Sequence, residues 1–221
     1  MNRTNYSLTR MKITKFGHCC MLVEEKDLNI LFDPGTNSTK QNELQNIDLI
    51  MITHTHSDHF DLDSIKKILK NNPNAKILTN TEVGKELKKA AIPFSILEHG
   101  QKVQVKGISI EAMGNDHAYL HHSVPCLQNT GYLIANRFFF PGDALTIPKN
   151  KIEILALPVA GPWLKLEEAI EYAKEIKPNI CFPVHDGGLK SIGSTNRIPP
   201  IVLEPLGITF KVLELEKENE F

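Results

Sequence analysis

A nearly continuous apolar run over residues 47–53 (IDLIMIT) limits the fold of this 221-residue chain more than any other feature. A strand with apolar side chains on both faces must be covered on both faces, which is typical of a sheet packed between other layers. Three histidines and an aspartate follow the run at once: His54, His56, Asp58 and His59. Polar side chains directly after a buried strand predict a site at the edge of a sheet.

The spacing of these four side chains indicates metal binding. In an extended segment residues i and i+2 point to the same side, so His54 and His56 can reach one metal ion together. Asp58 and His59 come where the chain turns into the next helix, so they can face a second point. The pattern predicts ligands for two adjacent cations, and imidazole with carboxylate suits zinc, manganese or iron. The alternative, a solvated loop without function, is disfavoured by the spacing.

A metal pair needs further ligands, and three other segments offer them. GNDHAY contains His117, FFFPGDAL contains Asp143, and CFPVHDG contains His185. Asp143 and His185 each follow an apolar run directly, so each is expected where a strand ends.

The remaining periodicity predicts a mixture of strands and helices. Strands are expected within residues 11–33 and at 75–79, 94–98, 102–105, 108–113, 130–135 and 152–159. Amphipathic helices are expected at 61–71, 81–91 and 165–177. Residues 114–129 show neither period and predict a long functional loop. Residues 185–197 (HDGGLKSIGSTNR) predict a flexible glycine-rich loop, and the alternative is a loop whose backbone N–H groups bind an anion. Strands then helices, once in each half, suggest sheets packed face to face with helices outside.

Composition narrows the class of function. A net charge of −1 argues against an electrostatic grip on nucleic acid, and no apolar stretch approaches the about 18 residues of a membrane span. Four cysteines form no CxxC pair, and the polar N-terminus has no apolar signal-peptide core, so we expect a protein of the reducing cytoplasm. Residues 1–10 are expected to be a polar tail and residues 11–221 a single domain. The oligomeric state has no signal in the sequence.

The motifs together resemble those of the metallo-β-lactamase fold superfamily of metal-dependent hydrolases. THTHSDH, a downstream histidine, GD at 142–143 and PVH at 183–185 carry the resemblance. The order of GHCCMLVE, ILFDPG, IDLIMITHTHSDHFD, GISIEAMGNDH and PGDAL is similar to a branch with ascorbate-phosphate lactonases and small hydrolases. The resemblance covers about residues 12–186. It implies an α/β (α+β) fold, a four-layer αββα sandwich in which helices flank two mixed β-sheets and metals lie at one edge.

The resemblance also implies a ligand set. His54, His56 and His117 match the first metal site, Asp58, His59 and His185 match the second, and Asp143 matches the ligand that bridges both. The implied enzyme is a dinuclear hydrolase, with zinc as the first choice of metal and manganese or iron as alternatives. A hydroxide that bridges the metals, oriented by Asp58, would cleave an ester, lactone or phosphoester of a small molecule. The rival hypotheses are an iron-dependent oxidoreductase on the same scaffold and a nuclease, which the near-neutral charge disfavours. A non-catalytic metal-binding protein is a further alternative, disfavoured because all seven ligand positions are occupied.

Several other residues allow two interpretations. Asp33 is either an acceptor for a ligand histidine or a turn aspartate that caps its own backbone. His18 is either close to the active site or a hydrogen-bonded core residue. His121 and His122 are candidates for substrate contact and compete with His117 as ligands. Trp163 and the three phenylalanines at 138–140 are interpreted as core residues.

Overall fold

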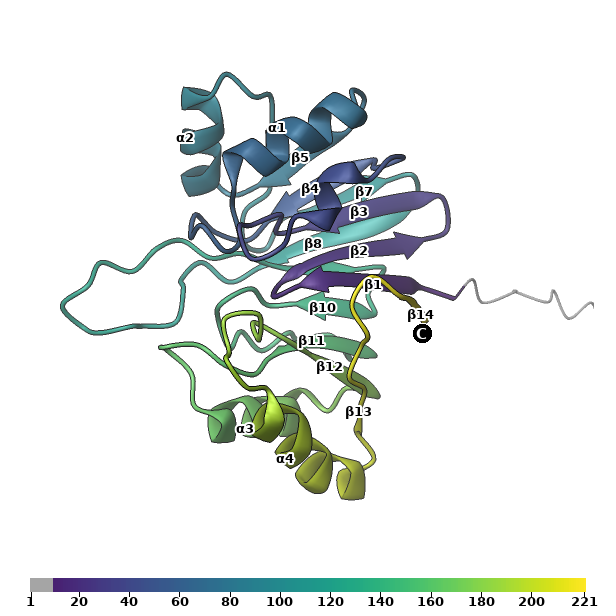
Figure 1. Cartoon of the computed structure of the whole chain (residues 1–221), viewed down its shortest axis with the longest axis vertical. Helices are drawn as coiled ribbons and strands as arrows, with labels where there is room; N and C mark the ends of the chain where they lie inside the picture. The colour runs from purple at the N-terminus through teal and green to yellow at the C-terminus, as the bar shows by residue number, and fades with distance from the viewer. Residues whose placement is uncertain (1–9) are drawn as a thin grey trace, which may run out of the picture.

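Two mixed seven-stranded sheets form the centre of residues 10–221, the part of the chain that this computed structural model describes (Figure 1). The first sheet contains, in spatial order, β14 (Glu218–Glu220), β1 (Lys12–Gly17), β2 (Cys20–Glu25), β3 (Leu28–Phe32), β4 (Leu49–Ile52), β5 (Lys76–Thr79) and β6 (Ser95–Ile96). The second contains β13 (Thr209–Phe210), β12 (Ile180–Val184), β11 (Ile154–Pro158), β10 (Phe138–Phe140), β9 (Gly131–Ile134), β8 (Ile108–Met113) and β7 (Lys102–Val105).

Both sheets are built in the same way. An antiparallel meander comes first, β1–β3 in one sheet and β7–β10 in the other, and parallel strands follow. Parallel neighbours need crossover connections, which are usually helical. The helices are α1 (Leu62–Asn71), α2 (Thr81–Lys89), α3 (Leu166–Ile176) and α4 (Gly193–Leu203), with short 3₁₀ turns η1 (Lys40–Glu43) and η2 (Glu204–Leu206). The last strand, β14, crosses back to pair with β1 of the first sheet.

Capping residues determine where the first two helices begin. Asp61 Oδ2 accepts a hydrogen bond from the backbone N–H of Ser64 at 3.0 Å, and Asn80 Oδ1 accepts one from Val83 at 3.0 Å. Such caps satisfy amide groups that a helix leaves unpaired at its first turn. Because Asp61 lies two residues after His59, the cap also sets where the histidine-rich segment ends.

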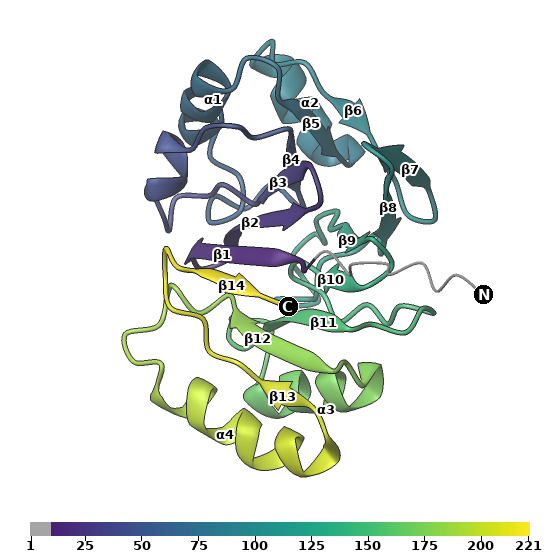
Figure 2. The same cartoon turned by 90° about the vertical axis from the view of Figure 1, so that its right-hand side faces the viewer.

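The elements stack in four layers. Helices α1 and α2 cover the outer face of the first sheet, and α3 with α4 cover the outer face of the second (Figures 1 and 2). Between the sheets lie large buried side chains such as Phe32, Tyr132 and Phe138, with the Phe32 and Phe138 ring centroids 6.0 Å apart. Burial of such side chains on both faces explains the unbroken apolar strands. The expected αββα sandwich is confirmed.

One segment differs from its expectation. Residues 193–197, expected to belong to a flexible loop, form the first turns of α4. Pro199 and Pro200 argue against a helix in the sequence, because proline lacks the backbone donor that a helix interior uses. The helix forms because Thr195, Pro199 and Leu203 are buried, and α4 packs against α3 and β13. Tertiary packing outweighs local propensity here.

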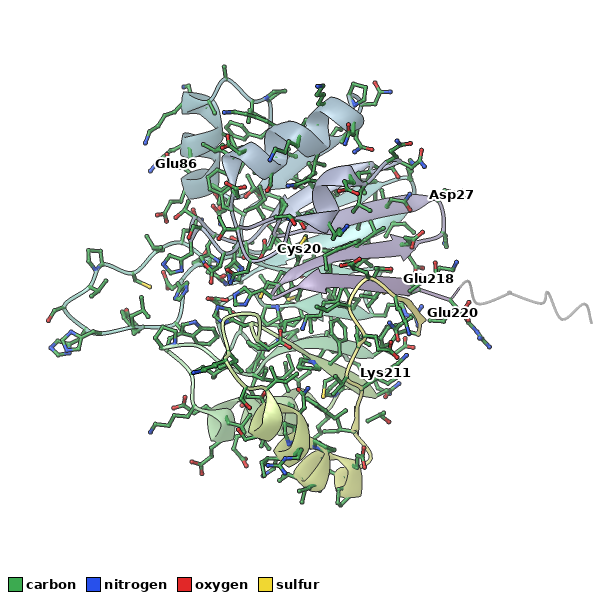
Figure 3. The ribbon with its side chains drawn as sticks, viewed as in Figure 1. Cys20, Asp27, Glu86, Lys211, Glu218 and Glu220 are labelled. Atoms are coloured by element: carbon green, nitrogen blue, oxygen red, sulfur yellow. The ribbon has the colours of Figure 1, made fainter. Side chains whose placement is uncertain are left out.

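The two ends of the sandwich differ in character. Figure 3 shows Asp27, Glu218 and Glu220 at the end away from the long loop 114–129. Glu218 pairs with Lys12 at 3.0 Å and Glu220 with Arg10 at 2.7 Å, so these acidic groups are neutralised by neighbours. Of the expected tail, residues 1–9 lie outside the described residues. Within residues 10–221, no helix combines the length and apolarity needed to cross a membrane.

Candidate metal centre

Strand direction brings the predicted ligands to one edge. His54 follows β4, His117 follows β8, Asp143 follows β10 and His185 follows β12. Strands β10 to β12 are parallel, and β8 runs the same way because β8 and β10 are each antiparallel to β9. The carboxyl ends of these strands therefore meet at the same edge of the second sheet, where β4 of the first sheet also ends.

The first group contains His54, His56, His117 and Asp143. His54 Nε2 lies 3.1 Å from His56 Nδ1, and His117 Nε2 lies 3.3 Å from Asp143 Oδ2. His117 Nδ1 donates to the carbonyl oxygen of Ala118, so its Nε2 carries a free lone pair. Three imidazole nitrogens and one carboxylate oxygen thus converge on one point, as ligands of a single cation would.

The second group contains Asp58, His59 and His185, with His18 beside them. His185 Nε2 lies 2.8 Å from Asp143 Oδ2 and 3.8 Å from Asp58 Oδ2. His59 Nε2 lies 3.2 Å from Asp143 Oδ1. Asp143 therefore faces both groups, one oxygen toward His59 and the other between His117 and His185.

The pKa values of the centre are shifted because buried carboxylates and imidazoles lie close to one another. Burial would raise the pKa of Asp143, but the surrounding imidazoles, His59 first among them, hold it well below its usual value. Burial would lower the pKa of His59, but the carboxylates of Asp143 and Asp33 raise it to about 9. Burial and the neighbouring His59 lower the pKa of His54. An ionised carboxylate among imidazoles is a suitable donor set for a divalent cation.

A single carboxylate orients histidines of both groups. Asp33 Oδ2 accepts a hydrogen bond from His59 Nδ1–H at 2.7 Å and another from the Thr53 hydroxyl at 2.7 Å. Because that hydroxyl has only one proton, Thr53 Oγ1 must accept from His54 Nδ1–H, 2.9 Å away. The Nε2 atom of His54, and that of His59 once this ring has lost a proton, as a metal ligand must, then carry lone pairs that face Asp143. Of the two interpretations of Asp33, the hydrogen bond to a predicted ligand histidine is the one that the structure contains.

His18 contacts a predicted ligand through its own hydrogen bonds. Its Nδ1 accepts from the backbone N–H of Gly187 at 3.1 Å, so its Nε2 carries the proton and donates to Asp58 Oδ2 at 3.0 Å. Burial lowers the pKa of His18, in agreement with a neutral ring. A Cβ at Gly187 would meet the His18 Cβ at 2.9 Å, so this approach requires glycine. His18 therefore orients Asp58.

Three buried polar atoms of the centre have no hydrogen-bond partner within the described part of the chain. They are His59 Nε2, His117 Nε2 and Asp143 Oδ1. The 3.2 Å approach of His59 Nε2 to Asp143 Oδ1 does not have the geometry of a hydrogen bond. Each buried unpaired polar atom costs about 1–3 kcal/mol. Two cations, one beside each group, would satisfy these three atoms, so the residues fit a metal pair.

The backbone at this edge is held in strained conformations. His18, Asp33 and His185 have φ values of +50°, +40° and +61°, which side chains other than glycine rarely adopt. Gly35 lets the turn after β3 lie against the backbone of Asp58, because a Cβ there would overlap its carbonyl. Strain of this kind persists where the surrounding structure holds it, and it gathers at functional sites.

Residues 12–185 match the model of the Beta-lactamase superfamily domain. The chain belongs to the β-lactamase superfamily. The resemblance predicted from the motifs is confirmed, and the corresponding general activity is metal-dependent hydrolysis.

Individual relatives are similar over most of their length. Protein Rv0786c of Mycobacterium tuberculosis is 33% identical over 180 residues, which cover 79% of this chain and 84% of that protein. A protein of Thermoplasma volcanium called a UPF0173 metal-dependent hydrolase is 28% identical over 190 residues, 79% of this chain and 83% of its own. The structure of Igni18, a metallo hydrolase of Ignicoccus hospitalis, has a TM-score of 0.76 at 21% identity and covers 96% of this chain and 99% of that one.

The interpretation of Trp163 as a core residue is wrong. This side chain is half-buried in the loop after β11, at the edge that carries the predicted ligands. Its indole Nε1–H donates to Asp143 Oδ2 at 3.1 Å, and its ring lies edge-on to His117 and His185, with centroids 5.8 and 5.7 Å apart. Its position after an apolar strand, in LPVAGPW, was the available signal.

The two histidines of the long loop lie elsewhere. His121 and His122 are exposed, with ring centroids 4.0 Å apart and ring planes tilted by 36°, and they belong to neither ligand group. His117 instead joins the first group. Contact of His121 or His122 with a substrate stays a prediction, based on the position of their loop beside the centre.

Sequence reasoning missed one buried lysine of the centre. Lys15 Nζ donates to the carbonyl oxygen of Pro183 at 2.8 Å and to Asp186 Oδ1 at 2.7 Å. These two partners lie on either side of His185, so the lysine, which comes from β1, ties the end of β12 to the other sheet. The sequence of β1 alone does not predict this contact, because the partners of Lys15 lie in a distant segment of the chain.

Proposed function

We propose that the chain is a dinuclear metal-dependent hydrolase. His54, His56 and His117 would hold one cation, Asp58, His59 and His185 the other, and Asp143 both. The observation that carries this proposal is the position of the Asp143 carboxylate, with Oδ1 3.2 Å from His59 Nε2 and Oδ2 3.3 Å from His117 Nε2. Among residues 10–221, only the Asp143 carboxylate lies within 4.0 Å of imidazole nitrogens of both groups.

The chemistry divides between the metals and the protein. Two divalent cations held by these residues would supply a water of lowered pKa and would polarise the bond that is to be cleaved. Burial would raise the pKa of Asp58, but the hydrogen bond from His18 and the charge of His59 lower it below its usual value. A carboxylate that resists protonation is a weak general base. We therefore assign Asp58 the role of a ligand that orients the attacking water, held in turn by His18.

The bond cleaved is that of an ester, lactone or phosphoester in a small molecule. Zinc is the metal that we expect first, because imidazole-rich sites with carboxylates suit it, and manganese or iron would also fit. The four cysteines are all free thiols, which agrees with a reducing compartment such as the cytoplasm.

Elemental mass spectrometry on untagged protein, purified without chelator, tests the metal centre. About two zinc or manganese ions per chain are expected, with turnover of at least one ester, lactone or phosphodiester in a panel. Substantial iron would favour the oxidoreductase. No retained metal after reconstitution would contradict the proposal.

Paired variants test the choice of ligand. His117→Ala should lose about one metal ion per chain, because it removes one of three imidazoles from the first group. The double variant His121→Ala/His122→Ala is the matched control and should retain both ions. If the double variant loses a metal ion and His117→Ala does not, the ligand is His121 or His122 and not His117.

A further inference from the structure

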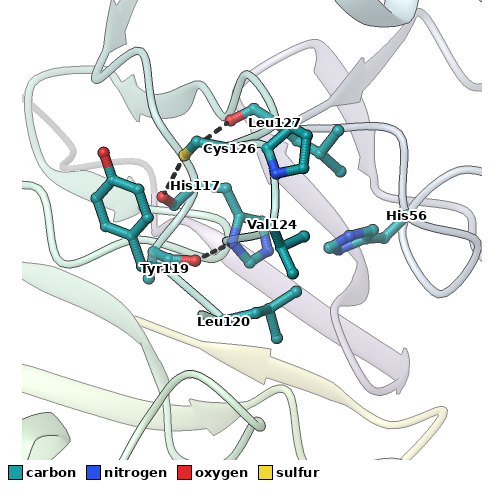
Figure 4. A pocket seen from close by; sticks show the side chains of 9 residues that line it. His56, His117, Tyr119, Leu120, Val124, Cys126 and Leu127 are labelled. Carbon is teal, nitrogen blue, oxygen red and sulfur yellow. Dashed lines mark hydrogen bonds between the residues drawn. The ribbon is translucent and has the colours of Figure 1, made fainter. Parts of the chain in front are cut away.

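A pocket of about 270 Å³ borders the metal centre on the side of the first group (Figure 4). Two predicted ligands, His56 and His117, form its inner wall, so a molecule in the pocket touches the centre. The outer wall comes from the long loop after β8, chiefly Tyr119, Leu120, Val124 and Leu127.

The side chains of this loop are apolar although solvent reaches them. Tyr119 is 69% exposed, Leu120 42% and Val124 47%. Single exposed apolar side chains are common on protein surfaces. Three exposed apolar side chains on one loop, all lining the same pocket, indicate a surface that binds an apolar group. The loop has no packing reason for them, because they do not belong to any of the three apolar cores.

The pocket offers no partner for a charged group. None of its lining residues is Lys, Arg, Asp or Glu, and its only polar side chains besides the tyrosine hydroxyl and a thiol are the two imidazoles. A charge placed there would lose its hydration without compensation. At ~30 Å³ for each water-sized group, the pocket holds roughly nine non-hydrogen atoms, the size of a medium alkyl chain or a substituted ring.

A second pocket, of about 390 Å³, borders the other group of ligands. Its walls include Asn37, Asp58 and His185, so it is the more polar of the two. Neither pocket is lined by Lys or Arg, so neither could neutralise an anionic group beyond the metals. A substrate whose reacting carbon lies at the centre can extend its apolar part into the first pocket and its polar leaving group into the second.

We propose that the pocket beside His56 and His117 binds the apolar acyl chain of an ester or lactone substrate. This inference rests on the proposed hydrolase activity. Hydrolysis would break the acyl C–O bond, with the hydroxyl of water joining the acyl carbon and its proton joining the alcohol oxygen. Leu120 and Val124 then determine specificity for the acyl group.

Binding of simple carboxylates tests the pocket without requiring turnover. Isothermal titration calorimetry on protein reconstituted with zinc compares hexanoate with acetate. Hexanoate should bind at least about tenfold more tightly, because its additional methylene groups leave water for the pocket. In Leu120→Ser/Val124→Ser this preference should disappear. The matched control is Ile201→Ser, which removes an exposed apolar side chain on α4 (68% exposed) and should keep the preference.

Kinetics with 4-nitrophenyl acetate and hexanoate separate the two proposals. Hydrolysis of both esters at equal kcat/KM, or equal affinity for both carboxylates, would overturn the acyl pocket and leave the hydrolase intact. A hexanoate preference that is lost in the double variant, without turnover of any ester or lactone, would support the pocket and overturn the ester activity. Retention of the preference in the double variant would assign it to another surface.

Discussion

The indole Nε1–H of Trp163 donates a hydrogen bond to Asp143 Oδ2 at 3.1 Å. This joins the chain's single tryptophan to the carboxylate that faces both ligand groups. The same ring lies edge-on to His117 and His185, one from each group. The environment of the indole is therefore coupled to whatever Asp143 binds.

The first prediction concerns tryptophan fluorescence. Adding zinc to metal-free protein should change the emission of Trp163, and cobalt should quench it, with a break at about two equivalents. Trp163→Phe is expected to lose the signal and to bind zinc about tenfold more weakly, because it removes a hydrogen bond that orients a ligand. A competition assay with a chromophoric chelator measures that affinity. Stoichiometric zinc uptake with unchanged emission in the wild type would contradict the coupling.

The second prediction concerns Asp33, which bonds directly to His59 and through Thr53 to His54. Asp33→Asn replaces an acceptor by an amide that can also donate, so both histidines should lose their orientation. We expect zinc affinity to fall about 10–100-fold at both sites, measured by metal retention after dialysis. Asp48→Asn, whose partner is Lys106, is the matched control. Loss confined to one ion would show that the Thr53 link does not matter.

The third prediction concerns Asp58. Asp58→Ala should lose most turnover while the first metal stays largely bound, because Asp58 is absent from the group of His54, His56 and His117. Turnover of any substrate found for the wild type and metal content of the same sample together measure this. Wild-type rates in the variant would refute the assigned role. Loss of both metals would instead show that Asp58 holds the centre together.

The fourth prediction concerns thiol reactivity. Cys126 is exposed and lines the apolar pocket, whereas Cys19, Cys20 and Cys181 are buried. Burial raises the pKa of Cys181 to about 12 and also raises that of Cys19 well above its usual value. A thiol reagent should therefore label one cysteine in the native protein and all four after denaturation. Fast labelling of more than one in the native state would contradict the packing, and hexanoate should slow labelling of Cys126.

The sequence showed the local parts of the centre because chemistry and spacing are local properties. His54 and His56, two apart after a buried strand, face one point whatever else the fold does. Asp143 and His185 follow apolar runs, so their place at strand ends was evident. Trp163 was misjudged because an aromatic side chain after a strand has the same local pattern whether it packs in a core or against a ligand. Pro199 and Pro200 concealed α4 for a similar reason, since packing against α3 and β13 supports that helix.

By itself, the sequence determined the superfamily, the alternation of strands and helices, and the residue types that could bind metal. Only the tertiary structure decided which atoms meet. The bonds from Asp33 to His59 and Thr53, from His18 to Asp58 and from Trp163 to Asp143 join segments 20 or more residues apart. Such contacts depend on sheet register and on the closure of two sheets over one core. Those are properties of the whole chain, because no short segment can satisfy its own buried polar groups at that edge.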